Sequence, residues 1–376
     1  IAAHDEAERL AGIAGDQVLA AYVHYTRGSG RCLRADIRRG LRELEAGIAE
    51  IDTLLADHHL LPTEAQAMSV IRRLLPDGVD QITTTVDGSH FNLQRAILIN
   101  WLGHSGHYRE AIAIGDTFRT GVEETFGPDY YLRPLCSSGL HGIAHAQAAL
   151  GRPDDARATL RLSRAAVTAQ RDHAFVEVTH WSEQLMVLIP YLTDQLAERG
   201  RLIAEANRAW ERCNGMTIVV AGDGAPSEVQ NDLLEGRWQK AEQLATDHLT
   251  APWVNLTQEA IAVLAILAHR QGQPEIAWQR VGQLLPEGPA TEPGNAFFPH
   301  AITAIAVAVE LALDAGDSAT ARRWIETHGR WLDWSGAKLW QADHQLLLAR
   351  WHKRAGQRGH AVNHANAARE LASDPR

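Results

Sequence analysis

The sequence is poor in cysteine and in long apolar runs, and each shortage excludes a class of protein. Its three cysteines, Cys32, Cys136 and Cys213, lie far apart without C-x-x-C spacing. This pattern excludes a disulfide framework and indicates reduced thiols. No stretch approaches the ~18 uninterrupted apolar residues of a membrane-spanning helix. We therefore expect a cytoplasmic protein without a membrane segment.

Basic charge and strand-forming runs are also scarce. The chain has 36 basic and 46 acidic residues, a net charge of −10, and no basic stripe interleaved with aromatics. Direct nucleic-acid binding by this segment is not expected, because phosphate contacts need clustered Lys and Arg. Aromatic residues make up only 6% of the chain, and β-branched runs are confined to residues 81–86 and 217–220. Ala, Leu, Arg, Glu and Gln recur instead, which predicts an all-α fold.

A short signature recurs along the chain: a Gly followed five residues later by an Ala, between two amphipathic segments. The copies are Gly106/Ala111, Gly151/Ala156, Gly236/Ala241, Gly272/Ala277, Gly316/Ala321 and Gly356/Ala361. One interval is of double length and holds a pair of helical segments, 173–191 and 195–213, without the signature. An earlier copy, Ala35/Gly40, has the two small residues exchanged. Such self-similarity is typical of helical repeat proteins.

The signature has a physical reason. The Gly suits the left-handed position that ends the first helix of a hairpin, where a Cβ is unfavourable. The Ala lies in the first turn of the second helix, where a small side chain lets antiparallel helices approach closely. Apolar residues spaced at i, i+3, i+4 and i+7 accompany it, as at 298, 302, 305, 309 and 313. We therefore predict an α-α superhelix, an open solenoid of stacked helix hairpins.

The repeats divide the chain into parts of one elongated array of about eight hairpins. We predict degenerate N-terminal repeats over 1–57, an irregular connection over 58–92, middle repeats over 93–213 and C-terminal repeats over 225–376. Residues 1–15 and 360–376 both read as second helices without a neighbour. The segment is therefore expected to be a piece of a longer protein.

Two copies of the signature resemble the tetratricopeptide consensus. Residues 101–111 read Trp-Leu-Gly-His-Ser-Gly-His-Tyr-Arg-Glu-Ala, and residues 234–241 read Leu-Glu-Gly-Arg-Trp-Gln-Lys-Ala. Both keep the Gly, an aromatic residue and the Ala in order, whereas the other copies lack the aromatic. The chain thus resembles a divergent tetratricopeptide-like array.

Four further segments resemble the sensor arm of large LuxR-type regulators related to the maltose-regulon activator. They are Leu-Leu-Glu-Gly-Arg-Trp at 233–238, residues 288–294, Trp-Leu-Asp-Trp-Ser-Gly-Ala at 331–337, and Asp-Pro-Arg at 374–376. In that family a signalling ATPase precedes the repeats and a helix-turn-helix follows them. The resemblance implies a regulatory domain that senses a ligand or partner protein and relays the signal to attached effector domains.

Signatures of catalysis and cofactor binding are missing from the sequence. It contains neither a G-x-x-x-x-G-K-[ST] phosphate loop nor a G-x-S-x-G nucleophile elbow. His141/His145 and His360/His364 each share a helical face, but neither pair has the Glu of a zincin motif. We predict no catalytic residue, no metal and no cofactor. Trp331, Trp334 and Trp340 are expected to pack in the core rather than form a ligand platform.

Polar residues one or two turns before each hairpin Gly are the candidates for ligand or partner binding, because the first helices of stacked hairpins line the concave face. They are Asn100, His104, His141, His145, Glu259, His269, Arg270, Glu310, Arg350 and Arg354. Their mixed charge favours a partner protein, a peptide or a small polar ligand. Two alternatives are a free-standing scaffold or peptide receptor, and an all-α toroidal hydrolase with paired acids.

Overall fold

The computed structural model describes residues 2–15, 17–56, 89–125, 133–168, 174–213, 228–250 and 254–373. Within these ranges all regular elements are helices, which confirms the predicted all-α fold. The β-branched runs at 81–86 and 217–220 lie outside the described residues, as does most of the predicted connection at 58–92.

The helices follow one another as antiparallel neighbours. In chain order they are α1 (Ala2–Ala14), α2 (Gln17–Cys32), α3 (Ile37–Ala56), α5 (Ser89–Ser105), α6 (Tyr108–Thr125), α7 (Arg133–Ala149), α8 (Pro153–Thr168), α9 (Ala174–Leu188), α10 (Leu196–Cys213), α11 (Glu228–Leu234), α12 (Trp238–His248), α13 (Val254–Arg270), α14 (Pro274–Leu284), α15 (Phe298–Asp314), α16 (Ser318–Ser335), α17 (Gln341–Arg354) and α18 (Arg358–Ser373). Short 3₁₀ turns lie at Ile189–Tyr191 and Gly288–Ala290.

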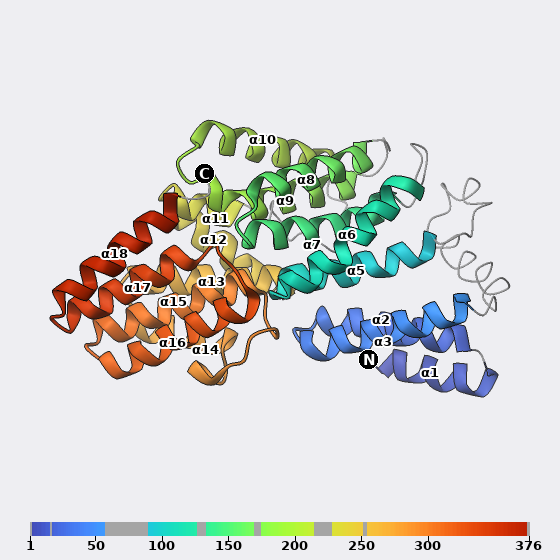
Figure 1. Ribbon diagram of the computed structural model, residues 1–376, viewed down its shortest axis with the longest axis horizontal. Coiled ribbons are helices and arrows are strands. Elements are labelled where there is room, and N and C mark those ends of the chain that lie inside the picture. The colour runs from blue at the N-terminus through green and yellow to red at the C-terminus, as the bar shows by residue number, and fades with distance from the viewer. Residues whose placement is uncertain are drawn as a thin grey trace.

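Successive helices pair into hairpins from one end of the long axis, at α1–α3, to the other, at α16–α18 (Figure 1). The first helices of the hairpins also pack on one another: α5 on α7, α7 on α9, α11 on α13, α13 on α15, and α15 on α17. The first helices therefore form an inner layer, and the second helices, such as α8 and α14, cover it.

The six signature glycines close the first helices as the sequence predicts. All have a positive φ, from 72° at Gly272 to 94° at Gly106. After each of them, the next N–H donates to the carbonyl five residues earlier, as from Asp317 to Ala312 at 2.9 Å. This bond is the mark of a Schellman turn. The exchanged copy behaves alike, because Ala35 has a φ of 66° although it carries a Cβ.

The predicted small residues of the second helices are buried. Ala111, Ala156, Ala241, Ala277 and Ala321 are fully buried, and Ala361 in the last hairpin is half-buried. The hairpin without the signature is also confirmed, since α9 and α10 occupy the predicted segments.

An even closer approach occurs inside the inner layer, where α5 crosses α7. A Cβ on Gly103 would lie 2.3 Å from the carbonyl oxygen of Gly142, and a Cβ on Gly142 would lie 2.3 Å from the carbonyl oxygen of Ile99. The two backbones can come this close only because both residues at the crossing are glycines, which carry no Cβ.

Hairpins that are not neighbours in sequence also contact one another. A rod in which each hairpin contacted only its neighbours would lack such contacts. The ring of Trp101 in α5 lies 5.7 Å from that of Phe297, just before α15. The carbonyl of Ala149 accepts hydrogen bonds from Lys338 N at 2.7 Å and Leu339 N at 3.1 Å. One continuous apolar core joins residues of α3 and α5–α7 to residues of α13–α17. The C-terminal hairpins therefore pack against the middle ones.

One predicted boundary was wrong. Residues 89–92, assigned to the irregular connection, form the first turn of α5. The sequence did not reveal this turn, because three of its four residues are polar and apolar periodicity starts only further along the chain. No helix in the described part of the chain is both long and apolar enough to cross a membrane.

The crossing of α5 and α7 predicts a strong response to a single methyl group. We expect Gly103→Ala to lower the free energy of unfolding by about 1–3 kcal/mol, because the two backbones must separate. Gly200→Ala is the matched control, since nothing lies within 4 Å of its Cβ on α10, and it should raise the free energy of unfolding by up to ~1 kcal/mol. Urea denaturation measures both, and equal values for the two variants would contradict the crossing.

The turn at Ala35 should be improvable. Because an L-residue in the left-handed region is strained, we expect Ala35→Gly to raise the free energy of unfolding by up to about 1 kcal/mol. The reverse change, Gly316→Ala, tests strain alone, since Gly316 has a φ of 73° and open space around it. It should lower the stability by about the same amount. Thermal denaturation followed by circular dichroism measures both changes. An unchanged melting temperature in either variant would show that its left-handed turn does not strain an alanine.

Candidate functional site

A cavity of about 230 Å³ lies within the inner layer. Its wall is built from α7, α9, α11, α13 and α15, with Tyr108 of α6 and the segment Leu339–Trp340 before α17. The first helices contribute small side chains here, such as Ala148, Ala149 and Ala262, so the space between them is not filled. An apolar cavity of about 150 Å³ is already large enough to bind benzene. This cavity can therefore hold a small organic molecule.

A few polar groups interrupt the apolar wall. They are Tyr108, His145, Thr193, Gln230, Glu259, His300 and Thr303. A mostly apolar pocket with a few converging polar groups is the usual form of a small-molecule site.

Glu259 is the acidic member of this set, and its environment strongly perturbs it. Its side chain is buried in α13, and its Oε1 has no hydrogen-bond partner among the described residues. Burial raises the pKa of Glu259 from 4.5 to about 8, although a hydrogen bond from Gln230 opposes the shift. The carboxyl is therefore largely protonated at neutral pH and can donate a hydrogen bond to a molecule in the cavity.

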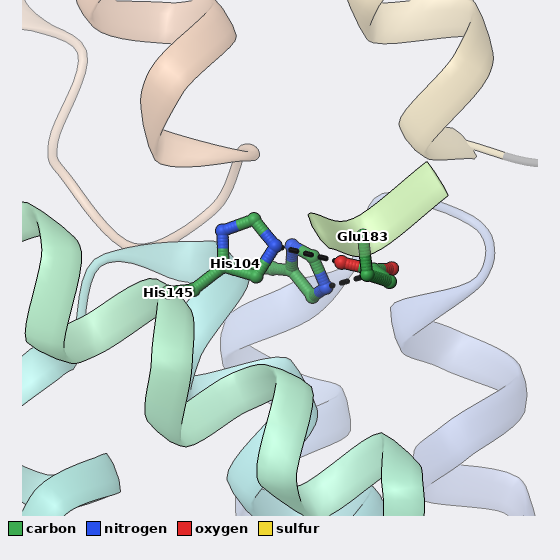
Figure 2. A group of neighbouring side chains, drawn as sticks. All are labelled: His104, His145 and Glu183. Carbon is green, nitrogen blue, oxygen red and sulfur yellow. Dashed lines mark hydrogen bonds and ion pairs between the residues drawn. The ribbon is translucent and has the colours of Figure 1, made fainter. Parts of the chain in front are cut away.

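His145 belongs both to the cavity wall and to a buried cluster with His104 and Glu183. Figure 2 shows Glu183 of α9 facing His104 of α5 and His145 of α7. His145 Nε2 lies 2.7 Å from Glu183 Oε2, and His104 Nε2 lies 3.6 Å from Glu183 Oε1. The two imidazole rings are 4.2 Å apart, and all three residues are less than 10% exposed.

Burial and the electrostatic interactions among the buried side chains shift the pKa values in and beside this cluster. Burial alone would raise the pKa of Glu183, but His104 and His145 outweigh it and hold the pKa well below its usual value. Burial, followed by the charge of His104, lowers the pKa of His145. Burial, with the nearby charges of His104 and His145, lowers the pKa of His300 to about 3. At neutral pH the cluster thus contains the ionised carboxylate of Glu183 beside the neutral imidazole of His145.

A second polar network continues along α7. Ser163 Oγ of α8 lies 3.0 Å from His141 Nε2 and 3.2 Å from His180 Nδ1. Burial is the main reason that the pKa of His141 falls to about 4 and that of His180 to about 3. These histidines are hydrogen-bonded core residues.

A separate surface groove of about 540 Å³ lies across α13, α15 and α17. Most of its charged groups are already paired: His269 Nε2 lies 3.0 Å from Asp314 Oδ2, Arg354 Nη2 lies 3.1 Å from Asp314 Oδ1, and Arg350 pairs with Glu310. A partner binding here would have to compete with these ion pairs.

The structure divides nine of the ten predicted binding residues into two groups that lie apart. His104, His141, His145 and Glu259 are buried in the inner layer, and Asn100 is half-buried beside them in α5. His269, Glu310, Arg350 and Arg354 line the surface groove. Arg270 belongs to neither group, since its guanidinium lies over the ring of Trp238.

Three residues of the interior were missed: Glu183, Gln230 and His300. The prediction counted back one or two turns from each hairpin glycine. Glu183 lies in the hairpin that has no such glycine, and His300 lies sixteen residues before Gly316. A signal did exist for Glu183, because it is one of only two acids in α9, a helix of apolar average composition.

Of the three tryptophans expected in the core, Trp331 packs there and Trp340 lies at the cavity, whereas the expectation was wrong for Trp334, which lies at the surface. Trp331 is fully buried, and its Nε1 donates to the carbonyl of Thr291 at 3.1 Å. Trp334 is 38% exposed and contacts His107 edge-on. Trp340 contacts Phe298 and also lines the cavity.

No protein-family model matches the chain, and no curated protein matches it. The resemblances to tetratricopeptide arrays and to LuxR-type sensor arms therefore stay predictions. The cavity and the buried clusters beside it are the features of the structure that bear on function.

The raised pKa of Glu259 predicts a pH-dependent stability. Between pH 4.5 and about 8 the folded state binds a proton that the unfolded state releases, so stability falls as pH rises through this window. Between pH 6.5 and 8 we expect the free energy of unfolding of the wild type to fall by up to ~2 kcal/mol more than that of Glu259→Gln.

Urea denaturation at several pH values measures this difference. Glu275→Gln, at an exposed position of α14, serves as the control and should follow the wild type. Parallel pH profiles for the wild type and Glu259→Gln would show that Glu259 is ionised in the fold.

Proposed function

We propose that this chain is a non-catalytic, ligand-sensing domain whose cavity binds a small and mostly apolar molecule. The observation that carries this proposal is the cavity itself. Five first helices enclose it, and the buried Glu259 presents an oxygen without a partner among the described residues. A buried polar group without a partner is unfavourable by about 1–3 kcal/mol, and a bound ligand can satisfy it.

The lining indicates the chemistry of the ligand. Aliphatic side chains, together with those of Met186, two prolines and Trp340, make most of the wall, which favours an apolar body. The protonated carboxyl of Glu259 and the neutral imidazole of His300 favour a neutral oxygen acceptor such as a carbonyl or hydroxyl group.

The position of the cavity supports a sensing role. A ligand there contacts helices of five hairpins and the segment Leu339–Trp340, which packs on the end of α7. Binding can therefore favour one arrangement of the middle and C-terminal hairpins over others. In our proposal this change is relayed to attached effector domains, as the resemblance to LuxR-type sensor arms implies for a transcriptional regulator.

Two features favour binding over the alternatives. Glu259 is the only acid among the described residues that line the cavity, whereas glycoside hydrolysis uses a pair of carboxylates. The surface groove would suit a peptide receptor, but most of its charges already pair with one another. The cavity is therefore the better candidate.

A neutral fluorescent probe tests the cavity. We expect N-phenyl-1-naphthylamine to bind the wild type, with fluorescence enhancement that saturates at one probe per chain. Ala262→Leu fills part of the wall on α13 and should weaken binding roughly tenfold, equivalent to about 1.4 kcal/mol.

The matched control is Ala204→Leu, at an exposed position of α10, which should bind the probe like the wild type. Absence of saturable binding, or equal affinity in Ala262→Leu and the wild type, would rule out the cavity as the site.

A further inference from the structure

We propose that His104, His145 and Glu183 form a binding site for one divalent transition-metal ion of the zinc class. One ligand atom from each residue lies within 4.8 Å of the other two. The three side chains come from α5, α7 and α9, the first helices of three consecutive hairpins. This site is distinct from the proposed ligand cavity, although His145 belongs to both.

The donor atoms match the chemistry of such an ion. Two imidazole nitrogens and one carboxylate oxygen form a set that zinc uses in sites with an open coordination position. Calcium and magnesium prefer oxygen ligands throughout. Nitrogen and carboxylate donors in this ratio also suit other first-row transition-metal ions. The two histidines therefore define the class of the ion as a transition metal.

The spacing needs only a small adjustment. Tetrahedral bonds of about 2.1 Å place neighbouring ligand atoms about 3.4 Å apart. His104 Nε2 and Glu183 Oε1 are already 3.6 Å apart, while His145 Nε2 and Glu183 Oε2, at 2.7 Å, share a hydrogen bond. Opening that pair by less than about 1 Å admits an ion. A single ion would engage all three side chains, whereas the hydrogen bond engages only His145 and Glu183.

The surroundings hold the ligands in place and leave a way in. The ring of Phe297 lies 5.2 Å from that of His104, and Gln258 Oε1 accepts a hydrogen bond from Phe297 N at 2.8 Å. An apolar neighbour of this kind limits the access of water to a metal site. His145 lines the cavity, which gives the ion a path. The position that three protein ligands leave free can take water or a donor atom of a cavity ligand.

The test uses the full chain, freed of metal with a chelator and then equilibrated with Zn²⁺. Inductively coupled plasma mass spectrometry should find one tightly bound zinc ion per chain. Co²⁺ in place of zinc should give the visible absorption bands of a four- or five-coordinate ion. His104→Gln, His145→Gln and Glu183→Gln should each weaken zinc binding by more than the ~10–100-fold seen when only a second-layer partner is lost.

Three controls locate the ion. Glu259→Gln changes the cavity but not the cluster and should keep the zinc, so failure of the cavity proposal stays distinguishable from failure of this one. His269→Gln, in the surface groove, should also keep it. The rings of His352, His360 and His364 gather on α17 and α18, so the double variant His360→Gln/His364→Gln tests surface binding.

Two results would overturn the proposal: a wild-type chain that retains no zinc, or loss of the zinc in the double surface variant but not in the cluster variants. Circular dichroism checks that each variant folds. If the cluster variants do not fold, X-ray absorption of the wild type with zinc decides, because a first shell without two imidazoles would also overturn the site.

Discussion

The contact on which both functional features depend is the crossing of α5 and α7 at Gly103 and Gly142. Each glycine lacks the Cβ that would strike the other backbone at 2.3 Å. His104 follows the first glycine, and His141 precedes the second. Close approach of the two backbones is thus what brings the rings of His104 and His145 to 4.2 Å. Any side chain larger than hydrogen at the crossing would separate the imidazoles and move one wall of the cavity.

The inner layer combines buried polar groups with unfilled volume. The second helices place small alanines against their partners, although they also bury polar side chains such as His248 and His328. The first helices bury histidines and glutamates as well, and in addition they leave space between alanines of α7 and α13. Buried polar groups and unfilled volume both lower stability unless they are paired or occupied. It is their combination around α7 and α13, rather than buried polarity alone, on which the proposed ligand cavity rests.

Local features were predictable from the sequence. The glycine turns and the alanines depend on residues that are close in the chain, so their spacing revealed the hairpins, and the helix pair α9 and α10 could be placed in the double interval. The partners of the site residues were not predictable. His145 was predicted to face an open groove, yet it is buried against Glu183, 38 residues away. Contacts such as that between Trp101 and Phe297 depend on how distant hairpins meet, which no periodicity encodes.

His145 connects the two proposals in one physical argument. It lines the cavity and it contacts Glu183, so the position of α7 influences both sites. An ion held by α5, α7 and α9 would fix that wall, and a ligand would then bind to helices that are already ordered. Linkage makes the effect reciprocal: whatever factor the ion adds to the affinity for the ligand, the ligand adds to the affinity for the ion. A domain built in this way responds to two chemical signals through the orientation of a single inner helix.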